Sequence, residues 1–167
     1  MPDRIPPHKV CEFLASDEDR VAMCERLIRP YGKASLCLVE FEREGKSYTF
    51  DTVTALQNRY PEKQFAFVCG GDMLTSFDQW YRYEDLMRLL PFIVFEREGT
   101  DHREFERRRK QFSAMGMAIT VPKTVVPAVS STAFRAKPEE GGRLLPAEVY
   151  AYIKAKGIYQ GGTSGQV

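Results

Sequence analysis

Residues 64–77, QFAFVCGGDMLTSF, decide the fold expected for this chain. An apolar run of strand length, QFAFVC, meets Gly70 and Gly71, and Asp72 then begins a run typical of a helix. Strand, tight turn and helix in this order indicate part of a βαβ unit. A glycine in such a turn lets the backbone approach a ligand closely, and the Asp72 carboxylate could accept hydrogen bonds from ribose hydroxyls. The turn is not GxGxxG, which argues against a hydride-transferring Rossmann enzyme.

Strand and helix signals continue to alternate on both sides of this stretch. Strands are expected over 35–41, 64–69, 91–96 and 117–121, and helices over 17–28, 73–77, 80–90, 102–112, 130–135 and 146–156. A further helix is expected to follow SYTFDT and to close at Tyr60 and Pro61. Ser16 is a plausible N-cap of the first helix and Gly157 a plausible C-cap of the last. This alternation predicts an α/β fold with a parallel sheet flanked by helices on both faces. Ligands bind such sheets at the carboxyl ends of the strands, where SYTFDT, CGGD and VSST would lie.

Composition excludes several classes of protein. The chain has 167 residues, is 43% hydrophobic and 28% charged, and carries a formal net charge of +1. Such a balance is normal for one folded domain and argues against a nucleic-acid-binding surface. The basic run at residues 107–110 is interleaved with glutamates, and Phe105 and Phe112 lie at helical spacing, so we expect a solvated amphipathic helix there.

Membrane, redox and metal functions are not indicated either. No apolar run approaches the ~20 residues of a membrane helix, and MPDRIPPHK lacks the apolar core of a signal peptide. The four cysteines form no CxxC, so we expect reduced thiols, no metal site and a cytoplasmic protein.

Six polar clusters occur in a characteristic order. They are PPHK (6–9), SYTFDT (47–52), the GxD turn (70–72), WYRY (80–83), SSTxxR (130–135) and a closing helix that ends in KGIY (156–159). In this order they resemble those of bacterial nicotinate-nucleotide adenylyltransferases, from about Pro6 to Tyr159. The resemblance implies a Rossmann-like nucleotidyltransferase fold. It also implies transfer of AMP from Mg²⁺-ATP to nicotinate mononucleotide, giving nicotinate adenine dinucleotide and pyrophosphate in NAD biosynthesis.

The resemblance assigns one set of residues to ATP. These are Gly70, Asp72, Ser130, Ser131, Thr132 and Arg135, with Lys9 and Arg135 also expected to neutralise charge during catalysis. A helix N-terminus with hydroxyl donors suits phosphate. Helix capping alone would also explain the serines, and Lys9 could be an ordinary exposed lysine.

A second set is assigned to the nicotinate nucleotide. It comprises Ser47, Tyr48, Thr49, Asp51, Trp80, Tyr81 and Arg97. Trp80 is expected to stack on the pyridine ring, and Thr49 with the N–H of Tyr81 to hold the carboxylate. The two aromatic residues could instead be ordinary helix packing, and Asp51 could be a helix N-cap.

One part of the family pattern is absent from these residues. The family carries a loop of the form GxFxPxHxGH whose histidines contact the ATP phosphates, whereas His8 and His102 are the only histidines here and lack this spacing. We therefore expect residues 1–160 to be one nucleotidyltransferase domain without its N-terminal βαβ portion, encoded upstream of Met1, and 161–167 to be a disordered tail. The chain alone is expected to be impaired. The alternatives are a non-catalytic nucleotide-binding remnant and a pantetheine-phosphate adenylyltransferase. A homo-oligomer is compatible with the sequence.

Overall fold

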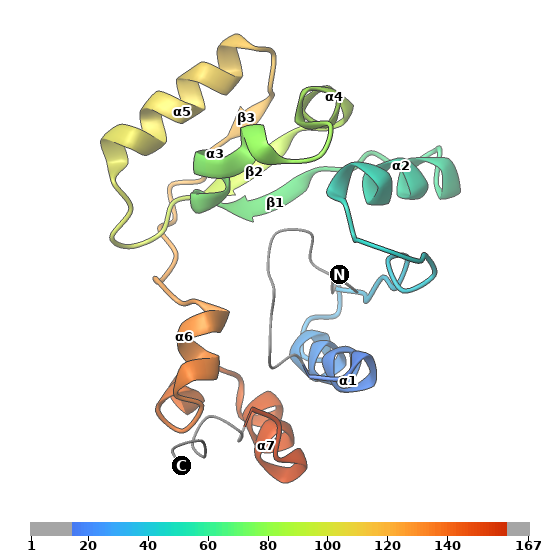
Figure 1. Ribbon diagram of the computed structural model, residues 1–167, viewed down its shortest axis with the longest axis vertical. Helices are drawn as coiled ribbons and strands as arrows, with labels where there is room; N and C mark the ends of the chain where they lie inside the picture. The colour runs from blue at the N-terminus through green and yellow to red at the C-terminus, as the bar shows by residue number, and fades with distance from the viewer. Residues whose placement is uncertain (1–14, 160–167) are drawn as a thin grey trace, which may run out of the picture. The chain divides into compact units, whose positions relative to one another are not determined.

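The computed structural model describes residues 15–159, which divide into two compact units (Figure 1). Unit 1 combines Met1–Ser47 with Val129–Val167, and unit 2 is Tyr48–Ala128. The elements of unit 1 are α1 (Asp17–Ile28), α6 (Ser131–Ala136), the 3₁₀ helix η2 (Glu140–Arg143) and α7 (Ala147–Lys156). The elements of unit 2 are α2 (Thr49–Arg59), β1 (Phe67–Gly70), α3 (Asp72–Ser76), the 3₁₀ helix η1 (Phe77–Gln79), α4 (Tyr83–Leu89), β2 (Phe92–Phe95), α5 (His102–Ala114) and β3 (Ile119–Thr120).

The sheet of unit 2 confirms the expected parallel arrangement. Its strands lie in the order β1-β2-β3, and both pairs are parallel. Phe67 is opposite Phe92, and Phe92 is opposite Ile119. The register therefore aligns the carboxyl ends of β1 and β2, and Gly70 lies beside Phe95.

The core of unit 2 lies against one face of this sheet. Alternate strand residues, among them Phe67, Phe92 and Val94, belong to a cluster with side chains from α2, α3, α4 and α5. Phe77 at its centre has no exposed surface and contacts four other aromatic rings. On the opposite face Val68 is 59% exposed. The hydrophobic contacts thus tie the helices to the strands that position the site.

Unit 1 is built on the pairing of α1 with α7. Ser16 is the N-cap of α1 as expected, because its hydroxyl accepts the N–H of Asp19. The Tyr152 hydroxyl of α7 donates to Asp19 at 2.7 Å, and this hydrogen bond lowers the pKa of the Asp19 carboxyl. Gly157 ends α7 in the left-handed conformation, with φ of 65°. Both predicted caps are therefore confirmed.

Two predicted elements differ from the structure. Residues 35–41 are not a strand: the N–H of Phe41 donates to the carbonyl of Leu38 in a turn, with Val39 and Glu40 buried. Apolar residues alone do not make a strand without a partner for its backbone.

The helix predicted over 80–90 begins only at Tyr83. Trp80 is extended and Arg82 is left-handed, with φ of 53°, so residues 80–82 of the WYRY segment form a turn that precedes α4.

No helix among residues 15–159 is long and apolar enough to cross a membrane.

Candidate active site

The carboxyl ends of β1 and β2 bring together three of the predicted site residues. Gly70 ends β1, Asp72 begins α3 and Arg97 lies just beyond β2. The Arg97 Nε lies 3.5 Å from Oδ1 of Asp72. A parallel bridge between Arg97 and Val126 fixes the backbone that carries the guanidinium. A cation and a carboxylate therefore meet at the edge where parallel sheets bind ligands.

A Cβ on either glycine of this turn would come too close to neighbouring side chains. A Cβ on Gly70 would lie 2.5 Å from Oδ1 of Asp72 and 2.7 Å from Nε of Arg97. A Cβ on Gly71 would lie 2.9 Å from the ring of Phe105 on α5. Gly70 thus makes room for the charged pair, whereas Gly71 makes room for the core.

Cys69 precedes this turn and is not a reactive thiol. Burial, with a smaller contribution from the nearby Asp72 charge, raises the pKa of Cys69 to about 12. The thiol therefore stays protonated at neutral pH and is a poor nucleophile and a poor metal ligand. Among residues 15–159 no three His, Cys, Asp or Glu side chains group in a way that could hold a metal ion.

Residues 48–52 of the SYTFDT segment and the WYRY segment come together in unit 2. The rings of Tyr48 and Tyr81 are 4.6 Å apart between centroids, and Phe50 meets Tyr81 edge-on at 6.3 Å. Tyr48 is the N-cap of α2 and Thr49 its first residue. Tyr81 is 47% exposed, so one side of this aromatic contact is open to solvent.

Several N–H groups of the two segments donate to no backbone carbonyl among residues 15–159. Thr49, Phe50 and Asp51 form the first turn of α2, and their N–H groups have no acceptor within the helix. The N–H of Tyr81 donates to no backbone carbonyl in the described part of the chain. Asp51 is not the N-cap, which corrects that alternative, and Ser47 is buried at the end of unit 1.

Trp80 is held by its neighbours in the core. Its ring meets Phe67 edge-on at 6.0 Å and Phe77 at 5.7 Å, and it is partly exposed. These contacts support the packing alternative, and the ring stays partly exposed.

Arg82 is a residue of this region that the sequence analysis missed. Its guanidinium lies 3.9 Å from the centre of the Phe50 ring, and its Nε donates to Asp85 at 2.8 Å. A left-handed arginine costs free energy that its surroundings must offset, and such residues cluster at functional sites. No sequence pattern marks it, because arginine does not favour this conformation.

The predicted phosphate-binding segment begins α6 in unit 1. Ser130 is the N-cap, and its hydroxyl accepts the N–H of Ala133 at 3.0 Å, as the capping alternative predicted. Ser131 and Thr132 are exposed, and Arg135 is partly exposed one turn further on. Lys9 lies outside the described residues.

The basic helix α5 has the amphipathic character expected of it. Arg107 pairs with Glu104 and Arg109 with Glu106 along the solvent side, while Phe105 and Phe112 are buried. These ion pairs lower the pKa of both glutamates. Arg108 is the exception, since it is buried with the two phenylalanines.

Comparison with known proteins gives the same fold and a family. The model of the family described as Cytidylyltransferase-like matches residues 1–137. A Halalkalibacterium halodurans protein described as a probable nicotinate-nucleotide adenylyltransferase is 39% identical over 166 residues, covering 96% of this chain and 75% of its own length. A Bacillus cytotoxicus protein of the same description is 37% identical, covering 96% of this chain and 80% of its own length.

A solved structure supports the fold independently of close sequence similarity. The Plasmodium falciparum nicotinic acid mononucleotide adenylyltransferase, complexed with APC, superposes with a TM-score of 0.62 at 15% identity. The match covers 88% of this chain and 77% of that one.

The parallel sheet, with charged and glycine residues at its carboxyl edge, defines an α/β nucleotidyltransferase of the cytidylyltransferase-like class. Within that class, the sequence identity to the two bacterial relatives determines the family. The chain belongs to the nicotinate-nucleotide adenylyltransferase family.

Proposed function

We propose that the protein transfers AMP from ATP to nicotinate mononucleotide, giving nicotinate adenine dinucleotide and pyrophosphate in NAD biosynthesis. The observation that carries this proposal is the contact of Tyr81 with Tyr48 at the start of α2. It unites two segments, 33 residues apart in numbering, that the family resemblance assigns to one nucleotide. Membership of the family supplies the reaction class.

The nicotinate end requires a flat apolar surface and donors for a carboxylate. The exposed side of Tyr81 and the neighbouring Trp80 supply aromatic surface. The first N–H groups of α2, with the Tyr81 N–H, favour an anion over a neutral amide because the helix dipole is positive there. This charge preference would separate nicotinate from nicotinamide.

The ATP end would use the residues at the carboxyl edge of the sheet. Gly70 allows close approach of the nucleotide, Asp72 accepts from ribose hydroxyls and Arg97 faces phosphate charge. We assign the triphosphate to Ser130, Ser131, Thr132 and Arg135, with Lys9 adding a further cation. Mg²⁺ would enter chelated to the phosphates of ATP, since it commonly binds through substrate phosphates and water.

The chemistry is one in-line displacement. An oxygen of the nicotinate mononucleotide 5′-phosphate forms a bond to the α-phosphorus of ATP, and the bond from that phosphorus to the β-bridging oxygen breaks. Pyrophosphate leaves with the bonding electrons, so no covalent enzyme intermediate is required. The protein contributes orientation and neutralisation of converging negative charge.

Binding without catalysis is the second candidate for the 167 residues taken alone. It is favoured by the absence of a GxFxPxHxGH sequence from them. We expect these residues alone to bind nucleotides weakly and to give little or no product.

The test is an acceptor comparison, made with any residues that the gene encodes ahead of Met1 included. The protein is incubated with Mg²⁺-ATP and, separately, nicotinate mononucleotide, nicotinamide mononucleotide or pantetheine phosphate, and pyrophosphate release is measured. We expect release with nicotinate mononucleotide and much less with the other two. Release with pantetheine phosphate alone, or with none of the three, would refute the proposal.

A further inference from the structure

Arg108 lies where an arginine is costly. It follows Arg107, whose side chain is 60% exposed, and precedes Arg109, whose side chain is 32% exposed, yet its own side chain is only 7% exposed. Burial of a guanidinium is unfavourable unless hydrogen bonds replace its water. The position of this charge therefore requires an explanation.

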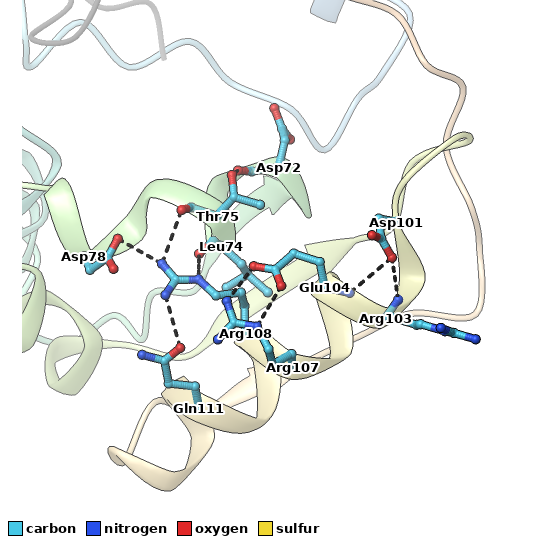
Figure 2. A network of polar contacts seen from close by, with 10 residues as sticks. All are labelled: Asp72, Leu74, Thr75, Asp78, Asp101, Arg103, Glu104, Arg107, Arg108 and Gln111. Carbon is cyan, nitrogen blue, oxygen red and sulfur yellow. Dashed lines mark hydrogen bonds and ion pairs between the residues drawn. The ribbon is translucent and has the colours of Figure 1, made fainter.

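All three guanidinium nitrogens of Arg108 have protein partners (Figure 2). Nε donates to the carbonyl of Leu74 at 2.9 Å, and Nη2 donates to the carbonyl of Thr75 at 3.3 Å. Nη1 donates to the Gln111 side chain at 3.1 Å. Nη2 also lies 2.9 Å from a carboxylate oxygen of Asp78.

These partners mark a break between two helices. α3 ends at Ser76, which has φ of −125°, and η1 begins at Phe77. Carbonyls at the end of a helix have no partner within it, and Leu74 and Thr75 occupy that place in α3. Asp78, on the far side of the break, belongs to η1. One guanidinium thus joins the last turn of α3 to the first turn of η1.

The segment held in this way carries candidate binding residues at both ends. Asp72 is the first residue of α3, and Trp80 immediately follows η1. We propose that Arg108 is a positioning residue, which fixes the α3–η1 break and thereby the orientation of Asp72 and Trp80 toward their ligands. The proposal rests on the proposed function for the identity of those ligands.

Lysine could not replace this arginine. The contacts require several N–H donors that diverge within one plane. A guanidinium supplies them, and a single ammonium does not. The variant R108K keeps the charge and loses that geometry. R107K is the matched control, because the hydrogen bonds of the Arg107 guanidinium found among residues 15–159 go to Glu104 of the same helix.

Steady-state kinetics test the positioning role, in the same form of the protein as the acceptor comparison. For R108K we expect KM for both nicotinate mononucleotide and ATP to rise on the order of tenfold, because misplaced contacts weaken binding. R107K should match the parent. D78N, which removes the negative charge of one partner on the exposed side of the network, should change KM in the same direction but less. R108K and D78N with parental KM for both substrates would overturn the proposal.

The emission of Trp80 gives a readout that needs no activity. Trp80 is the only tryptophan of the 167 residues, so the spectrum of this chain reports its surroundings alone. We expect R108K and D78N, folded by circular dichroism, to shift the emission to longer wavelength. An unchanged spectrum in both, or in D78N if R108K does not fold, would overturn the positioning role. An inactive parent with shifted emission would instead count against the proposed function alone.

Discussion

At the scale of single residues, Gly70 determines how Asp72 and Arg97 share space. In G70A the new Cβ would displace the ends of two flexible side chains rather than backbone. We expect a stability loss of about 1 kcal/mol or less and a clear rise in KM for ATP. G32A is the control, since a Cβ there meets nothing within 4 Å. Steady-state kinetics and urea unfolding of both variants measure these two effects. An unchanged KM for ATP in G70A would contradict the role of this turn in ATP binding.

Trp80 is predicted to affect one substrate only. An aromatic contact contributes about 0.5–1.5 kcal/mol beyond burial, which is roughly two- to tenfold in affinity. W80L should therefore raise KM for nicotinate mononucleotide within that range, whereas W80F should retain most of the contact. KM for ATP should change little. Y60L controls for loss of an exposed aromatic residue elsewhere. Equal effects of W80L and Y60L would show that Trp80 has no ligand contact.

His102 gives the stability of the protein a small dependence on pH. Its Nδ1 lies 2.9 Å from Glu96, and this hydrogen bond raises the pKa of His102 above 6.5. Because the folded-state pKa is raised, the stabilisation is fully present below pH 6.5 and is lost as pH rises through the folded-state value. Urea unfolding at pH 6 and pH 9 should show H102Q less pH-dependent than the parent. If the stability of H102Q and of the parent depended equally on pH, the stabilising role of the His102–Glu96 pair would be contradicted.

Local chemistry determined which single residues could be predicted. Ser16 and Gly157 act through their own helix ends, so their roles follow from sequence. Arg108 was missed, although its spacing from Phe105 and Phe112 places it on the buried face of α5. Arg82 could not have been found, because the Phe50 ring under its guanidinium belongs to α2, which is distant in the sequence.

At the scale of elements, variants of α6 distinguish helix capping from ligand binding, because different serines are assigned to the two roles. Ser130 caps the helix, so S130A should cost about 1 kcal/mol of stability. Ser131 is exposed and within the first turn, so S131A should leave stability unchanged and raise KM for ATP. Thermal unfolding and kinetics of the two variants provide the comparison. Unchanged KM in S131A would leave capping as the only role of this segment.

Elements with a strong local pattern were predicted well, and elements that depend on a partner were not. The strand–turn–helix of β1 and α3 and the helix α5 occur where expected. The predicted strand at 35–41 is a turn, since its apolar residues pack without a neighbouring strand. The late start of α4 reflects tertiary contacts of Tyr81 and Arg82 that override helix propensity.

At the scale of the whole molecule, the fold class could be predicted from the sequence, whereas the grouping of residues into two compact units could not. Alternation of strands and helices predicted the parallel sheet, because parallel strands need crossover connections. The expected single domain over 1–160 stays a prediction. The compact units join Met1–Ser47 to Val129–Val167, a pairing of distant segments that no local pattern encodes.

The central claim is that AMP passes from ATP to the phosphate of nicotinate mononucleotide. The most direct measurement follows ATP labelled at the α-phosphate, with the protein and any residues that the gene encodes ahead of Met1. We predict that the label appears in nicotinate adenine dinucleotide, in proportion to pyrophosphate released, and never on the protein. Label that remains in ATP, or that becomes attached to the protein or to a different acceptor, would contradict the claim.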